Sequence, residues 1–238
     1  VATGSAGSLA STVALSLVSN ANGVAGLSNG TATTVGTPGS ITTTGTVYSG
    51  QSVWNTNGGG QWGTLASNFG TNWQTFNGSP GLDGGFTNTD TATFSNALSS
   101  GTATVSGAAA TPSIKSLTFD NGVASYVLAG ASGGSLALLN SGTLAAGVTV
   151  DAGSHTVSLP LSLGSDTSWS VSAGARLGVS GVVSGAGDVA KVGNGTLVFS
   201  GNNGYSGITT VTAGTLVING DQSSANGAVS VAAGAVLA

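Results

Sequence analysis

The side chains most able to do chemistry in this sequence are an aspartate, a serine and a histidine that lie close together, Asp151, Ser154 and His155. These are the residue types of a catalytic triad, in which an imidazole is held between a nucleophile and a carboxylate. Ser154 and His155 are adjacent, however, and neighbouring residues of a β-strand point to opposite faces. The spacing therefore argues against nucleophilic catalysis and favours a turn with an exposed histidine.

Acid/base cleavage of polysaccharides is a second chemistry to consider, because it needs two carboxylates flanking the substrate. The candidates are Asp151, Asp166 and Asp188, with Arg176 near them in the sequence. No coil places two acids in a recurrent pattern, and glutamate is missing altogether. We interpret these aspartates as solvated turn residues and predict no catalytic residue and no enzymatic activity.

Calcium is the one metal ion that the residue types suggest, since Asp83 and Asp90 carry hard oxygen ligands. The sequence contains neither an acidic D-x-D-x-D loop nor the glycine-aspartate nonapeptide of calcium-binding β-rolls. Turn roles are the better interpretation of both aspartates. We predict no metal site and no cofactor.

Trp54, Trp62 and Trp73 are candidates for stacking on sugar rings. They lie in the segment that holds most of the aromatic residues of the chain, and this segment has few other large apolar side chains. Burial of the indoles in a core or cap is therefore favoured, because large rings remove much apolar area from water. Contact with surface glycans stays an alternative.

The chain has an unusually small number of charged residues, 4% of 238, with a net charge of −4. Lys115, Arg176 and Lys191 are its only cations, too few for the basic patch that a nucleic-acid partner requires. No apolar run approaches the roughly 20 residues of a membrane helix, so we predict no membrane span in this chain. Small polar residues with few oxidisable side chains suit an extracellular location.

A short motif, Val followed by two residues and Gly, recurs about every 20 residues in the second half of the chain. Such an interval, with β-type residues in each copy, is typical of a chain wound into stacked coils. We predict an all-β parallel solenoid of about 20 residues per coil. The valines of the motif should form one internal ladder, and the glycine that ends each motif should lie at a repeated corner of the coil. The valines are Val150, Val171, Val192, Val211 and Val231.

Three regions are predicted along the chain. Residues 1–49 carry no charge and form an N-terminal β arm, a possible donor strand, in which Leu9, Val13, Leu15 and Leu17 share one face of a strand. Residues 50–100 form an aromatic-rich β cap, and residues 101–238 form the solenoid.

The sequence GAGDVAKVGNGTLVFSGNNGYSG, from Gly185 to Gly207, followed by VTAGTL from Val211 to Leu216, resembles the autotransporter-associated β-strand repeat. The likeness covers about residues 182–238. It implies a right-handed parallel β-helix that is exported to the bacterial cell surface and has an adhesive or structural role.

The last ten residues, from Val229 to Ala238, carry no charge, and an open solenoid end exposes unpaired backbone groups. Together with the charge-free arm, this end predicts that copies of the chain join head to tail by β-strand addition into an extracellular fibre or layer. The alternative is a non-enzymatic adhesin or passenger stalk of a larger bacterial surface protein, with glycans as its ligands. The expected partners are thus other copies of the chain or surface glycans.

Overall fold

The computed structural model describes residues 7–14, 40–47, 50–63, 72–74, 79–81, 90–107, 111–130 and 134–238. The chain divides into two compact units, residues 1–48 and residues 49–238. In the first unit, β1 (Gly7–Ala14) pairs antiparallel with β2 (Ser40–Val47), so that Leu9 lies opposite Gly45 and Val13 opposite Ile41. The other two residues of the expected arm, Leu15 and Leu17, lie outside the described residues.

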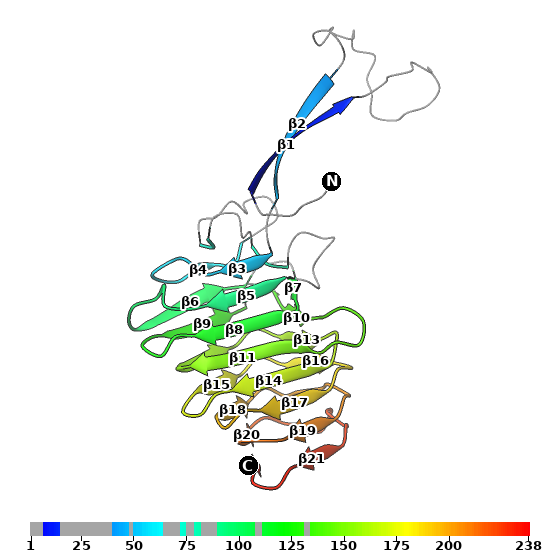
Figure 1. Ribbon diagram of the computed structural model, residues 1–238. Helices are drawn as coiled ribbons and strands as arrows, with labels where there is room; N and C mark the ends of the chain where they lie inside the picture. Colours follow the sequence, from blue (N-terminus) through cyan, green and yellow to red (C-terminus); the bar gives the residue numbers. More distant parts are fainter. Residues whose placement is uncertain are drawn as a thin grey trace, which may run out of the picture. The chain divides into compact units, whose positions relative to one another are not determined.

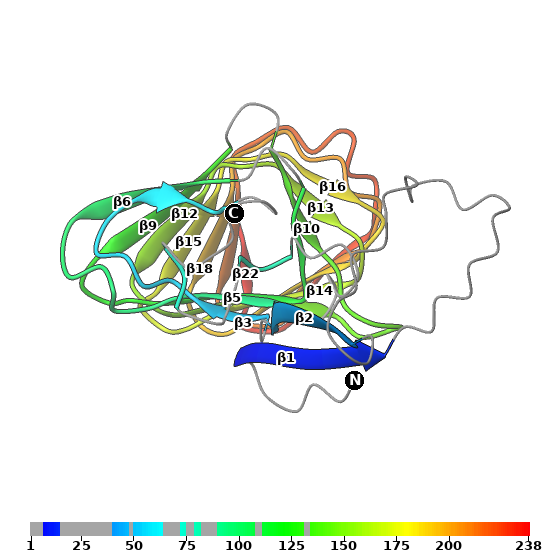
Figure 2. The same cartoon turned by 90° about the horizontal axis from the view of Figure 1, so that it is seen from above.

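The second unit is a parallel β-solenoid, and its described strands form three sheets that run along the stack (Figure 1). Figure 2, which looks down the stack, shows these sheets as the walls around the interior. Sheet 1 consists of β3 (Gln51–Val53), β5 (Thr91–Phe94), β8 (Ser116–Asp120), β11 (Ala146–Ala152), β14 (Thr167–Val171), β17 (Val189–Val192), β19 (Thr209–Val211) and β21 (Val229–Val231).

Sheet 2 consists of β4 (Gly60–Gln61), β6 (Thr102–Ser106), β9 (Ser125–Ala129), β12 (Ser154–Val157), β15 (Arg176–Val179), β18 (Thr196–Phe199), β20 (Thr215–Ile218) and β22 (Val236–Leu237). Sheet 3 consists of β7 (Ser113–Ile114), β10 (Leu136–Leu138), β13 (Leu161–Leu163) and β16 (Val183–Gly185). The predicted all-β parallel solenoid is confirmed.

The coils have nearly constant length toward the C-terminal end. In sheet 1, Ala146 pairs with Thr167, Thr167 with Val189, Val189 with Thr209 and Thr209 with Val229, which gives steps of 21, 22, 20 and 20 residues. Buried and half-buried residues alternate strictly along β14, as expected for a strand with one face toward a core. The repeat period in the sequence is therefore the length of one coil.

The predicted single ladder of five valines is wrong, because the register slips by one residue in its middle. Val150 pairs with Val171, and Val211 pairs with Val231, but Val192 pairs with Ser170. The coil step is 22 residues here, whereas the valines are 21 residues apart, and a slip of one residue turns a side chain to the opposite face of the sheet. Val192 is accordingly half-buried, while Val150, Val171 and Val211 are fully buried.

An in-register apolar column is instead found in sheet 2. Leu177 pairs with Leu197, Leu197 with Leu216, and Leu216 with Leu237. The first three leucines are buried, and Leu237 is 43% exposed because β22 has a strand neighbour on one side only. This column makes the interior continuous from one coil to the next.

The positions of the corner glycines reflect the same one-residue shift in register. Gly153, Gly174, Gly214 and Gly234 have positive φ angles and each lies three residues after its valine, as predicted. In the remaining copy the glycine with positive φ is Gly193, at +74°, and a Cβ atom there would clash with the carbonyl oxygen of Val171. Only glycine fits such a close approach, so the corner of this coil lies earlier in the sequence.

Lys191 is buried in the interior column that contains Val211. Its Nζ donates hydrogen bonds to the carbonyl oxygens of Val192, at 2.8 Å, of Gly193, at 2.6 Å, and of Ala213, at 3.2 Å. These acceptors belong to the corners of two successive coils. Burial lowers the pKa of the Lys191 ammonium. The lysine therefore connects two corners through backbone oxygens.

We predict that Lys191→Met lowers the free energy of unfolding by about 1–3 kcal/mol, because methionine fills a similar volume but leaves buried carbonyl groups without their donor. Denaturant-induced unfolding at pH 7 measures this change. Lys115→Met, at a half-buried position, is the matched control and should change stability by no more than about 0.5 kcal/mol. An unchanged or higher stability of Lys191→Met would show that desolvation of the ammonium outweighs its hydrogen bonds.

Candidate functional site

The three residues of the suspected triad do not face one another. In β12, Ser154 is exposed and His155 is buried, so their side chains lie on opposite faces of the sheet, as strand geometry predicts. Asp151 is exposed at the end of β11. The predicted exposed turn histidine, however, is wrong, because His155 is 1% exposed and lies within a strand.

The imidazole of His155 is fixed by two hydrogen bonds and a ring contact. Its Nδ1 accepts a hydrogen bond from the backbone N–H of Tyr126 at 3.1 Å, and its Nε2 lies 3.0 Å from the carbonyl oxygen of Ala152. Because Nδ1 accepts, the proton of the neutral ring is on Nε2, which donates to Ala152. The ring stacks on Phe119 at 4.8 Å. Burial lowers the pKa of His155, and the hydrogen bond to Ala152 opposes this shift in part.

A polar network next to this histidine connects successive coils. The hydroxyl of Tyr126 donates to the carbonyl oxygen of Ser95 at 2.8 Å and accepts from the N–H of Leu98 at 3.1 Å. The buried Asn121 side chain donates to the same two residues, at 3.0 Å to Ser95 O and 2.8 Å to Leu98 O. Burial raises the pKa of the Tyr126 hydroxyl. Each polar group has a protein partner, so the network has a structural role.

The carboxylates considered for polysaccharide cleavage bind backbone groups at successive corners. Asp166 Oδ1 accepts a hydrogen bond from the N–H of Asp188 at 3.0 Å, and Asp188 Oδ1 accepts one from the N–H of Ile208 at 2.8 Å. Asp151 and Arg176 are exposed on the outside of the coils. These bonds fit the interpretation of the aspartates as turn residues.

Asp90, one of the two calcium candidates, is buried, and its Oδ2 accepts a hydrogen bond from the N–H of Gly81 at 2.8 Å. The other candidate, Asp83, lies outside the described residues. Within the parts of the chain that the structure describes, no three His, Cys, Asp or Glu side chains are grouped so that they could hold a metal ion.

The tryptophans form the centre of the core at the N-terminal end of the solenoid. Trp54, Trp62 and Trp73 are at most 2% exposed, and Trp73 contacts both others edge to face, with centroids 5.1 and 5.2 Å apart. The indole nitrogen of Trp62 donates to the carbonyl oxygen of Pro80 at 2.9 Å, and that of Trp73 donates to Trp62 O at 2.7 Å. The indole faces are covered by protein, as the favoured interpretation requires, and are not available to a sugar in this structure.

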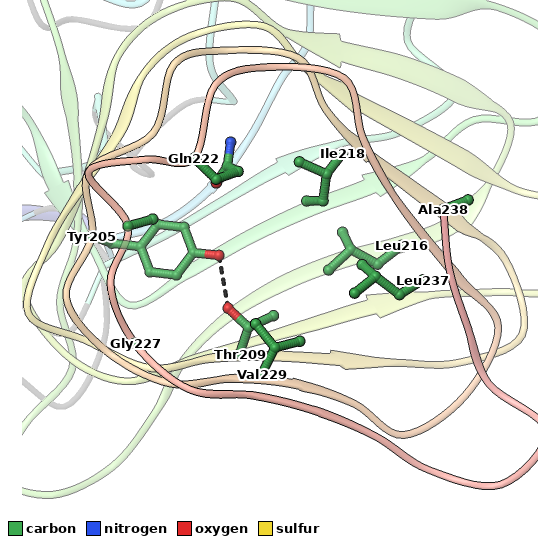
Figure 3. A pocket seen from close by; sticks show the side chains of 10 residues that line it. Tyr205, Thr209, Leu216, Ile218, Gln222, Gly227, Val229, Leu237 and Ala238 are labelled. Atoms are coloured by element: carbon green, nitrogen blue, oxygen red, sulfur yellow. Dashed lines mark hydrogen bonds between the residues drawn. The ribbon is translucent and has the colours of Figure 1, made fainter.

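The C-terminal end of the solenoid holds a cavity of about 370 Å³ (Figure 3). Tyr205 lines it and shares a hydrogen bond of 2.7 Å with the hydroxyl of Thr209. Ala225 follows Tyr205 by the same 20 residues that separate Thr209 from Val229, so a small side chain occupies the position equivalent to the tyrosine. The hollow therefore lies where the last coil lacks a large side chain.

Four large apolar side chains on the two strands at this end are exposed. Val229 is 56% exposed, Val231 42%, Val236 47% and Leu237 43%. They lie on β21 and β22, which end sheets 1 and 2 and have one strand neighbour each. In the described part of the chain, no helix is long and apolar enough to cross a membrane.

Comparison with known proteins places the repeat in a family. Residues 189–218 match the model of the passenger-associated-transport-repeat. A stretch of 58 residues is 52% identical to the adhesin BmaC autotransporter of Brucella suis biovar 1 (strain 1330) and covers 24% of this chain. The chain spans about 2% of the length of that relative. No solved structure matches the chain.

The matched segment runs from β17 to β20 and therefore includes both the buried Lys191 with its corner acceptors and the pair of Tyr205 and Thr209. Its residues stack the coils, and among the described residues none of them belongs to a group of three His, Cys, Asp or Glu side chains that could hold a metal ion. The resemblance seen in the sequence is thus confirmed for this part of the solenoid. Residues 189–218 match the passenger-associated-transport-repeat, and part of the chain is similar to an autotransporter adhesin.

Proposed function

We propose that the chain is a segment of the passenger of a bacterial surface adhesin, in which it acts as a non-enzymatic stalk. The observation that carries the proposal is the passenger-associated-transport-repeat at residues 189–218, built into a solenoid whose interior is continuous. The similarity to an autotransporter adhesin supports the same role. A stalk needs length and rigidity rather than a reactive site.

The energetics of the solenoid suit a stalk outside the cell. Each coil buries its apolar residues only against the coils on either side, so the stack resists local bending and opening. The cleavage sites for trypsin are Lys115, Arg176 and Lys191, and Lys191 is fully buried. Slow proteolysis is an advantage for a protein exposed on a surface, where unfolded segments are degraded.

In bacteria that produce the chain natively, we predict that antibodies against the solenoid label intact cells. Brief treatment of the intact cells with a broad-specificity protease should remove this label, because the stalk lies outside the cell envelope. A cytoplasmic protein serves as the control and should survive the treatment. Labelling that appears only after the cells are permeabilised would contradict the proposal.

A second candidate function is self-assembly, in which the C-terminal end of one copy binds another copy. The observation that favours it is the exposed apolar group of Val229, Val231, Val236 and Leu237 beside a cavity of about 370 Å³. Open strand edges with apolar side chains are templates for pairing with another chain. Such a contact between different ends does not close and would build a fibre.

For this candidate, we predict that the purified chain associates as its concentration rises and that Leu237→Lys abolishes the association, because a charge cannot be buried in the apolar contact. Val182→Lys is the matched control, since Val182 is 44% exposed elsewhere on the solenoid, and it should associate like the wild type. Sedimentation velocity and electron microscopy measure the result. A wild type that stays monomeric, or equal association of all three proteins, would exclude this contact.

A further inference from the structure

We propose that His155 makes the junction between β9 and β12 an acid-sensitive joint, so that protonation of its imidazole separates these two strands while β18 and β20 stay stacked.

The joint depends on a hydrogen bond that only the neutral imidazole can accept. His155 Nδ1 takes the proton of the Tyr126 N–H at 3.1 Å, so a side-chain nitrogen stands in the position of a ladder carbonyl between β12 and β9. In the imidazolium both ring nitrogens are donors. Protonation therefore brings two N–H donors face to face and leaves the buried N–H of Tyr126 without an acceptor, which destabilises the closed junction.

The surroundings offer backbone carbonyl oxygens, such as that of Ala152, but no carboxylate to a positive charge. Phe119 of β8 stacks on the imidazole at 4.8 Å, the Tyr126 ring of β9 lies at 6.0 Å, and Leu177 of β15 is the in-register neighbour. The charged residues on the adjacent strands, Asp120 of β8, Asp151 of β11 and Arg176 of β15, are all exposed on the outside of the coils. An imidazolium at this position would be a buried charge without a carboxylate partner.

The strands at this junction are also held together by few ladder pairs. β9 and β12 are joined by two in-register pairs, Thr156 with Val127 and Val157 with Leu128. By comparison, β12 and β15 are joined by four pairs, and β6 and β9 by five. The step from Val127 to Thr156 is 29 residues, longer than the coils that follow. Opening at this point breaks less of the sheet than opening at its neighbours.

Proton linkage gives the direction and size of the effect. Burial lowers the pKa of His155 in the closed joint, whereas an exposed histidine in the opened joint has a pKa of about 6.5. The opened state therefore binds more protons once the pH falls below about 6.5. The opening equilibrium should rise by up to about tenfold for each pH unit below this value, until the lower pKa of the closed state is reached. The closed joint is fully stable above pH 6.5 or so.

Native-state hydrogen exchange with mass spectrometry tests the proposal on the full chain between pH 7.5 and pH 5, with rates corrected for the intrinsic effect of pH. Peptides covering β9 and β12 should lose protection by up to about tenfold per pH unit below about 6.5. Peptides covering β18 and β20 should keep their protection over the same pH range. In His155→Gln, which offers an amide oxygen to Tyr126 but does not titrate, the loss in β9 and β12 should disappear.

Three results would overturn the proposal: protection of β9 and β12 in the wild type that does not change with pH, an equal loss in wild type and His155→Gln, or a loss spread over all coils. An equal loss would assign the effect to carboxylates. Since a variant can also fold poorly, the ¹⁵N chemical shifts of the wild-type imidazole provide an independent readout. We expect a neutral ring with its proton on Nε2 at pH 6.5, and a ring that titrates at or above pH 6.5 would contradict the proposal.

Discussion

In-register stacking of parallel coils is the constraint on which the rest of this structure depends. A single coil cannot bury its inward side chains, so the interior exists only where columns such as Leu177, Leu197 and Leu216 continue from strand to strand. Backbone hydrogen bonds between coils take the role that charged surface groups have in ordinary domains, which explains how a chain with 4% charged residues holds a fold. The buried polar side chains of Lys191 and His155 form hydrogen bonds with backbone groups of neighbouring coils.

The architecture could be predicted from the sequence because the period of the sequence repeat equals the number of residues in one coil. Val-x-x-Gly motifs about 20 residues apart indicated a solenoid, and paired residues of successive coils in sheet 1 are 20 to 22 residues apart. The interior could not be predicted to the residue, since strand periodicity is two and a slip of one residue exchanges inside and outside. The one-residue shift in register between β14 and β17 turns Val192 outward and Lys191 inward. The spacing of the valines alone does not show this shift.

Side-chain orientations in the candidate sites could be predicted where they depend on one strand. They could not be predicted where they depend on contacts between residues of different coils. Adjacent strand residues exclude Ser154 and His155 from one site, and this follows from the sequence alone. The buried position of His155 depends instead on Tyr126, 29 residues earlier, through a coil of irregular length. A lone histidine among serines and threonines gives no sign of such a partner. The passenger-type repeat, by contrast, is local, and its residues carried the family likeness.

Backbone NOEs between β14, β17 and β19 are the sharpest test of the stacked register, because they report which residues are neighbours across the stack. The register of sheet 1 predicts contacts of Ser170 with Val192 and of Lys191 with Val211. Contacts of Val171 with Val192 and of Val192 with Val211 would restore a single valine column and contradict the register described above. The absence of any contact between strands about 20 residues apart would contradict the stacked solenoid itself.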